Sequence, residues 1–200
     1  MPDVTATSLA RGVRIPNYKA PGQGSTAPKP FLVMPTTVAR KSVRIFHQKG
    51  SAEARTYLTS SFAGWLNHSH PAMRTNATNT IGALDTYISA DAADGRAFVG
   101  FGEYVIVKLP SGTIKTKVDV VTTRQKVLSG RAVFWDGKPI TLDQAQVIAY
   151  PYAVAARTLY PNEPVSDICV WQVRRGTLHV VSMTNALARA NDADEVLARL

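Results

Sequence analysis

One acidic side chain stands in the middle of a run of strand-forming residues. Asp119 lies in the segment Ile114-Lys-Thr-Lys-Val-Asp-Val-Val, where alternation places it on one face with Lys115 and Lys117. Carboxylates are disfavoured in strand interiors, so this one needs a specific partner. It is either a metal ligand or an ion-pair partner of the two lysines.

A second acid and a lysine stand two residues apart, at Asp136 and Lys138. A carboxylate can hold a divalent cation against a phosphate, and a lysine can orient the attacking water or stabilise developing negative charge. The intervening Gly137 allows a competing interpretation, because Asp-Gly is also an ordinary turn dipeptide beside which a lysine is simply solvated.

Gln146 and Tyr150 are four residues apart and therefore share one face of the helix predicted there. Their amide and hydroxyl groups could hydrogen-bond a phosphate or a catalytic loop. By itself, such a pair does not distinguish a binding site from an ordinary helix surface.

Along the chain, apolar residues recur with the spacing of a helix in some segments and with the spacing of a strand in others. The turn Pro110-Ser-Gly112 predicts a hairpin, and Thr141 with Gln144 predicts a capping box before a helix that Pro151 is expected to kink or interrupt. The predicted helices are 52–66, 78–91, 142–160 and 185–200, and the predicted strands are 98–109, 113–122, 131–135, 165–173 and 177–183. This order predicts an α/β (α+β) domain with a central mixed sheet flanked by helices.

Basic residues are concentrated toward the N-terminus. Residues 1–50 contain eight Lys and Arg residues and one acid, Asp3. Their net charge is +7, out of a net charge of +9 for the whole chain. Residues 1–36 are rich in Pro, Gly, Ser and Thr, which oppose regular structure. We therefore expect a flexible basic arm over residues 1–37 and a single domain over 38–200.

The arm would either neutralise phosphates or act as a solvated tail. The N-terminal residues expected to contact nucleic acid are Arg11, Arg14, Lys19, Arg40, Lys41 and Arg44.

Taken in order, the central segments resemble the RecB-type nucleases of the PD-(D/E)XK superfamily over residues 78–182. The run 114–121 is similar to that family's second strand, in which an acid follows an apolar residue. Residues 132–139, Ala-Val-Phe-Trp-Asp-Gly-Lys-Pro, fall where the family has its acid-x-lysine strand. Gln146-Val-Ile-Ala-Tyr150 matches its Gln-x-x-x-Tyr helix, whose polar residues would face DNA. The resemblance implies a restriction-endonuclease-like fold.

The resemblance also implies hydrolysis of DNA phosphodiester bonds with Mg²⁺ or Mn²⁺, ions that suit oxygen ligands and substrate phosphates. Carried onto this chain, it makes Asp119 and Asp136 catalytic metal ligands, with Glu103 as a further ligand. Lys138 would activate or position water. No iron–sulfur cluster is expected, because Cys169 is the single cysteine.

A second register of the resemblance is open. If Asp136-Gly137-Lys138 corresponds to the Thr-Gly-Lys that often continues the family's strand, Phe134 falls at the position of the acid and no strand lysine remains. The segment 79–85, where the family usually offers a histidine, contains none. In this register the fold would bind nucleic acid without cutting it.

Three functions are therefore expected. The first is a magnesium-dependent DNA nuclease of the RecB type, such as phages or plasmids encode, with DNA favoured over RNA. The second is a non-catalytic nucleic-acid-binding protein of the same fold. The third is a virion or assembly protein that forms homo-oligomers and whose basic arm meets nucleic acid or a neighbouring subunit.

No apolar run approaches the roughly 18–20 residues that span a bilayer, and the first residues have no signal-peptide pattern. We therefore expect no membrane partner. The expected location is the cytoplasm, or the virion if the chain is an assembly protein.

Overall fold

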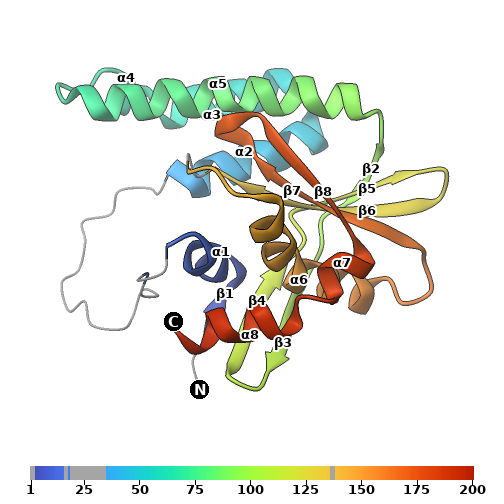
Figure 1. Cartoon of the computed structure of the whole chain (residues 1–200). Coiled ribbons are helices and arrows are strands. Elements are labelled where there is room, and N and C mark those ends of the chain that lie inside the picture. Colours follow the sequence, from blue (N-terminus) through green and yellow to red (C-terminus); the bar gives the residue numbers. More distant parts are fainter. Residues whose placement is uncertain (1–2, 16–17, 19–34, 136–137) are drawn as a thin grey trace.

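The computed structural model describes residues 3–15, 18, 35–135 and 138–200, and it has two sheets with helices on both sides (Figure 1). The larger sheet has the strand order β2-β5-β6-β7-β8, and the smaller has the order β1-β4-β3. The strands are β1 (Asp3–Thr5), β2 (Ala97–Gly100), β3 (Tyr104–Leu109), β4 (Gly112–Lys117), β5 (Val120–Arg124), β6 (Val127–Phe134), β7 (Val165–Gln172) and β8 (Thr177–Ser182). The helices are α1 (Ala6–Arg14), α2 (Pro35–Lys49), α3 (Ser51–Ser61), α4 (Ala63–Leu66), α5 (Pro71–Asp94), α6 (Leu142–Leu159), the 3₁₀ turn η1 (Val173–Arg175), α7 (Met183–Leu187) and α8 (Ala190–Ala198). The predicted α/β class with a mixed sheet flanked by helices is confirmed.

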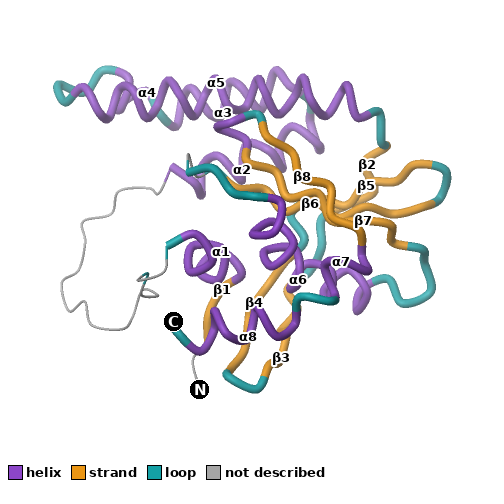
Figure 2. Tube along the Cα trace, viewed as in Figure 1, coloured by secondary structure: helices purple, strands orange, loops and turns teal. Residues whose placement is uncertain are grey.

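The five-stranded sheet separates two hydrophobic cores. Helices α2, α3 and α5 cover one face, while α6 covers the other together with α1, α8 and the small sheet (Figure 2). Along β6 the side chains alternate accordingly: Ala132 and Phe134 pack toward α6, and Val133 and Trp135 pack toward α2, α3 and α5. Strands β6 and β7 are parallel, with α6 as the connection between them, and the other pairs of this sheet are antiparallel.

Helix α6 begins as its sequence predicts. The Thr141 side chain accepts from the backbone N–H of Gln144, and the Gln144 side chain accepts from the N–H of Thr141, which completes the capping box. The helix continues through Pro151 to Leu159, so no interruption occurs there. Its buried side forms much of the core beneath the sheet.

The strand predicted over 113–122 is divided at Val118 and Asp119. Strand β4 pairs with β3 up to Lys117 opposite Tyr104, and β5 then pairs with β2 and β6 in the other sheet. Gly102 lies against this junction and donates its N–H to the Val118 carbonyl at 3.1 Å. A Cβ on Gly102 would lie 3.0 Å from both that oxygen and the Val118 Cβ, so glycine permits the close approach. Asp119 is thereby held at the point where the chain passes from one sheet to the other.

Residues 3–15 and 35–37 belong to the fold, which corrects the predicted arm over residues 1–37 for these described parts of it. Strand β1 pairs in parallel with β4, and Leu9 and Ala10 of α1 are buried in the core near α6 and α8. Helix α2 begins at Pro35, and residues 19–34 lie outside the described residues. A nine-residue helix is marginal in isolation and forms here because its apolar side is packed, which local composition does not reveal.

The packing of α1 against α8 gives a test of this correction. A methyl group at Gly12 would lie 2.9 Å from both Leu200 Cδ2 and Val196 Cγ1, so Gly12→Ala is expected to lower the free energy of unfolding by about 1–3 kcal/mol. Gly82 of α5 is the matched control, because nothing outside the helix backbone comes within 4 Å of a methyl group there. Gly82→Ala should instead stabilise by about 0.5–1 kcal/mol. Urea denaturation measures both, and effects of the same sign would contradict the packing.

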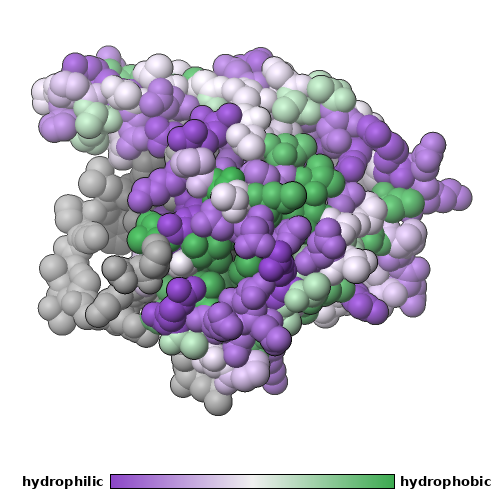
Figure 3. Space-filling view, viewed as in Figure 1, coloured by the Kyte–Doolittle hydropathy of each residue, from purple (hydrophilic) through white to green (hydrophobic). Residues whose placement is uncertain are grey.

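Apolar side chains reach the surface on β8, an edge strand of the larger sheet. Leu178 and Val180 are exposed there, and Figure 3 shows apolar surface in this part of the molecule, between α5 and α7. Within the described ranges, no helix is both long and apolar enough to cross a membrane.

Candidate functional site

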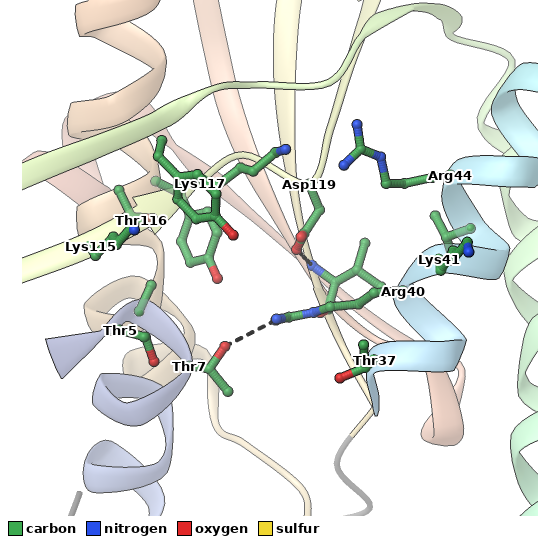
Figure 4. Close-up of a pocket in the computed structure, with 15 residues that line it drawn as sticks. Thr5, Thr7, Thr37, Arg40, Lys41, Arg44, Lys115, Thr116, Lys117 and Asp119 are labelled. Carbon is green, nitrogen blue, oxygen red and sulfur yellow. Dashed lines mark hydrogen bonds between the residues drawn. The ribbon is translucent and has the colours of Figure 1, made fainter. Parts of the chain in front are cut away.

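A pocket of about 530 Å³ opens between α1 and α2, with β4 along one side (Figure 4). Most of the polar side chains that line it are positively charged or carry hydroxyl groups. Asp119 is the one carboxylate among the described residues that line it. The cationic side chains are Arg40, Lys41 and Arg44 from α2 and Lys115 and Lys117 from β4.

Helical and strand periodicity bring these five cations together. On α2, residues 40, 41 and 44 lie within about one turn and face the pocket, whereas Ala39 and Ser42 are fully buried on the side toward α3 and α5. On β4, Lys115 and Lys117 share a face with Asp119, as alternation predicts. Three of the residues predicted to contact nucleic acid, Arg40, Lys41 and Arg44, therefore belong to a folded wall of this pocket.

Backbone hydrogen bonds hold Asp119 against β6. Its Oδ2 accepts from the Val133 N–H at 2.7 Å, and its own N–H donates to the Arg131 carbonyl at 2.9 Å. Burial raises the pKa of Asp119, and the positive charges of Arg40, Lys117 and Arg44 together with the Val133 N–H offset this only in part. The carboxylate is therefore a fixed feature of the pocket wall.

Arg40 crosses the pocket from α2. Its Nη2 donates to Thr7 Oγ1 at 3.1 Å and to the Val133 carbonyl at 3.4 Å, so it ties α2 to α1 and to β6 (Figure 4). Burial works against its charge, but Asp119, Tyr152 and Tyr104 together outweigh this, and the pKa of Arg40 is raised. The guanidinium places a permanent positive charge near the Asp119 carboxylate.

Tyr104 borders the pocket at the start of β3, and its side chain is 66% exposed. The ammonium groups of Lys115 and Lys117 lie 4.6 and 5.3 Å from the centre of its ring. Burial, and then repulsion by Arg44, lower the pKa of Lys117. An aromatic ring and two lysines thus form one side of the site.

The other predicted catalytic residues do not gather around Asp119 in the part of the chain that is described. Asp136 lies outside the described residues. Lys138 is exposed, and its carbonyl accepts from the Gln172 side chain at 2.5 Å. Glu103 is exposed in the connection between β2 and β3 and does not line the pocket.

The predicted DNA-facing pair on α6 points elsewhere. The Gln146 Oε1 accepts from Arg189 Nε at 3.0 Å, and Tyr150 is buried in the core beneath the sheet. Tyr152, two residues further along α6, lines the pocket instead. Sequence reasoning missed Tyr152, Tyr104 and Thr7, because no local pattern relates these three residues to Asp119.

The N-terminal basic residues of α1 also lie away from this pocket. Arg11 lies over the Tyr18 ring, 6.0 Å from its centre, and Arg14 Nε donates to the Ala10 carbonyl at 3.0 Å. Lys19 lies outside the described residues.

Among the described residues of the site, Asp119 is the one acidic side chain that a divalent cation could use. None of these residues belongs to a group of three or more His, Cys, Asp or Glu that could hold a metal ion. Asp119 already accepts from the Val133 N–H, and five positively charged side chains surround the same space. An Mg²⁺ ion would meet one carboxylate and a repulsive field.

No family model matches this chain, and no curated protein matches it. A solved structure described as "Crystal structure of SSO0001" aligns with 94% of this chain and 83% of its own length, at 10% sequence identity and a TM-score of 0.31. A TM-score of this size supports no inference about fold or function.

Proposed function

We propose that this protein binds nucleic acid through the pocket between α1 and α2 and does not cut it. The observation that carries the proposal is the charge of the pocket, in which five cationic side chains surround a single described carboxylate. Lys and Arg groups gathered in this way bind a phosphate backbone and release its counterions.

The residues of β6 beside Asp119 support binding without hydrolysis. Val133 holds the Asp119 carboxylate through its N–H, and Trp135 follows two residues later. Both side chains are apolar and buried toward α2, α3 and α5. We adopt the register in which Asp136-Gly137-Lys138 follows the strand, because Lys138 does not line the pocket beside Asp119. In this register the position of the acid falls on Phe134, which is apolar and buried toward α6, and no strand lysine remains.

Arg40 supports the same conclusion. Its guanidinium bonds Thr7 Oγ1 and the Val133 carbonyl, and its charge attracts Asp119. The Arg40 guanidinium therefore supplies the positive charge beside the Asp119 carboxylate. In a metal-dependent nuclease, a bound metal ion supplies that positive charge. On α2, Lys41 and Arg44 lie over the rings of Tyr57 and Phe101 at 5.0 and 4.5 Å, and both remain exposed to a phosphate ligand.

The test combines binding and cleavage on the same labelled DNA. Fluorescence anisotropy is measured with a strand of about 20 nucleotides, longer than a single-fold binding site, and gels follow its length in Mg²⁺, Mn²⁺ or EDTA. We expect binding that weakens steeply with salt and intact DNA in all three solutions. Asp119→Asn keeps an acceptor for the Val133 N–H but removes the negative charge, so affinity should rise about three- to tenfold.

Two results would overturn the proposal. Metal-dependent cleavage that disappears in Asp119→Asn would establish the nuclease instead. Failure to bind DNA even at low salt would remove nucleic acid as the ligand of this pocket.

A further inference from the structure

We propose that Tyr104 is a stacking platform for an unpaired base, so that the protein binds single-stranded DNA in preference to duplex. This inference rests on the proposed function, because it names the form of nucleic acid that the same pocket takes. It is carried by the exposure of Tyr104, by the side chains around its ring and by its place at a sheet edge.

Tyr104 presents a large aromatic surface to solvent. Its side chain is 66% exposed and belongs to neither hydrophobic core, although tyrosines usually bury much of the ring. The two lysine ammonium groups lie over the ring, 4.6 and 5.3 Å from its centre, so a base that stacks on Tyr104 meets positive charge beside it or displaces these flexible side chains. A ring of this kind beside cations is how proteins stack a base while holding the adjoining phosphate.

The pairing of β3 with β4 extends this surface into a stripe. Tyr104 lies opposite Lys117, and Ile106 lies opposite Lys115. Ile106 is 62% exposed on the same face, so apolar groups on β3 run beside basic groups on β4. Strand β3 is the edge of its sheet, which leaves this border open to a ligand.

The opposite wall of the pocket can hold phosphate. Lys41 and Arg44 of α2 are exposed there. Thr5, Ala6 and Thr7 at the start of α1 line the pocket on the side of β4, where Thr5 pairs with Lys115. The first turn of a helix has backbone N–H groups without helical partners and favours an anion. Base-binding and phosphate-binding groups therefore face the same space from two sides.

The size of the pocket excludes a duplex from this arrangement. A volume of about 530 Å³ is in the range of small-ligand sites and suits a nucleotide rather than a double helix. In a duplex the faces of each base are covered by its neighbours, so contact with Tyr104 would require unstacking. Single-stranded DNA can present a base without that cost.

The experiment compares three probes at one salt concentration by fluorescence anisotropy: a single strand, the matching duplex and an abasic single strand. The wild type is expected to bind the single strand about tenfold or more tightly than the other two. Tyr104→Ala should lose about tenfold in affinity for the single strand, leave the duplex and abasic affinities unchanged and retain the salt dependence. Tyr104→Phe, which keeps the ring, should bind as the wild type does.

Ile106→Ala controls for loss of exposed apolar surface on the same strand and should have the smaller effect, and thermal unfolding checks that each variant is folded. Equal wild-type affinity for single strand and duplex, or an unchanged affinity in Tyr104→Ala, overturns the stacking proposal while leaving the proposed function standing. Absence of binding to all three probes overturns the proposed function itself.

Discussion

Reversing the charges of Lys41 and Arg44 together is expected to weaken binding to single-stranded DNA by about a hundredfold or more near 0.1 M salt. Both side chains line the pocket from exposed positions on α2, so each substitution by glutamate removes a phosphate contact and introduces repulsion. If each residue neutralises one phosphate, the slope of log K against log salt should also fall in magnitude by about 1.4.

The matched control is the double variant Lys126→Glu and Arg157→Glu, in which Lys126 precedes β6 and lies seven strand residues, about 20 Å, from Val133 of the pocket. It makes the same change in net charge at two exposed residues that do not line the pocket. Its effect on affinity should be several times smaller, since exposed charges beyond about 10 Å are largely screened at this salt. Anisotropy titrations at several salt concentrations measure both variants. Equal losses in the two would mean that net charge, and not the pocket, determines binding.

The second large effect is expected at Arg131. This arginine of β6 is 0% exposed, and its guanidinium bonds Asp91, Asp94 and the Tyr87 hydroxyl of α5. Arg131→Ala would leave Asp91 without its cation and Asp94 with only the more distant Arg96, at 3.6 Å, so we expect the free energy of unfolding to fall by about 3–5 kcal/mol. Urea denaturation followed by circular dichroism measures the loss.

A triple variant tests whether unpaired charge is the cause. Arg131→Met combined with Asp91→Asn and Asp94→Asn removes the whole ionic cluster and fills the space of the arginine, so it should recover much of the stability lost in Arg131→Ala. A triple variant as unstable as the single one would show that the arginine contributes through packing, including its position over the Trp171 ring at 5.4 Å.

This cluster also connects the fold to the site. The Tyr87 hydroxyl lies 2.8 Å from His47 Nε2 at the far end of α2, and the Arg131 carbonyl accepts from the Asp119 N–H. Burial lowers the pKa of His47 to about 4, so the ring is neutral near pH 7 and adds no charge to the cluster. The α2 and β6 walls of the pocket are therefore held in part by the same buried network.

Much of the central fold could be predicted from local pattern. The hairpin between β3 and β4, the capping box of α6 and the closing pair β7 and β8 follow from turn residues and apolar periodicity, which act between near neighbours. Burial of Cys169 in β7 follows from its apolar neighbours.

The alternation of residue types along the sequence also predicted part of the site. Alternation predicted Lys115, Lys117 and Asp119 on one face and Ile114, Thr116, Val118 and Val120 on the other. The structure places the first three around the pocket and buries the other four, although Thr116 also lines the pocket. What alternation did not reveal was the break between β4 and β5, which depends on the pairing of each half with a different sheet.

Only the tertiary structure decided which residues share the pocket. Arg40 lies more than 70 residues before Lys115, and Thr7 and Tyr104 come from still other elements, yet all four line one space. Their proximity depends on the parallel pairing of β1 with β4 and on the packing of α1 and α2, contacts between distant segments that no local spacing encodes. The same contacts turned the predicted arm into folded structure, because a short helix is stable when its apolar side is buried and marginal when it is not.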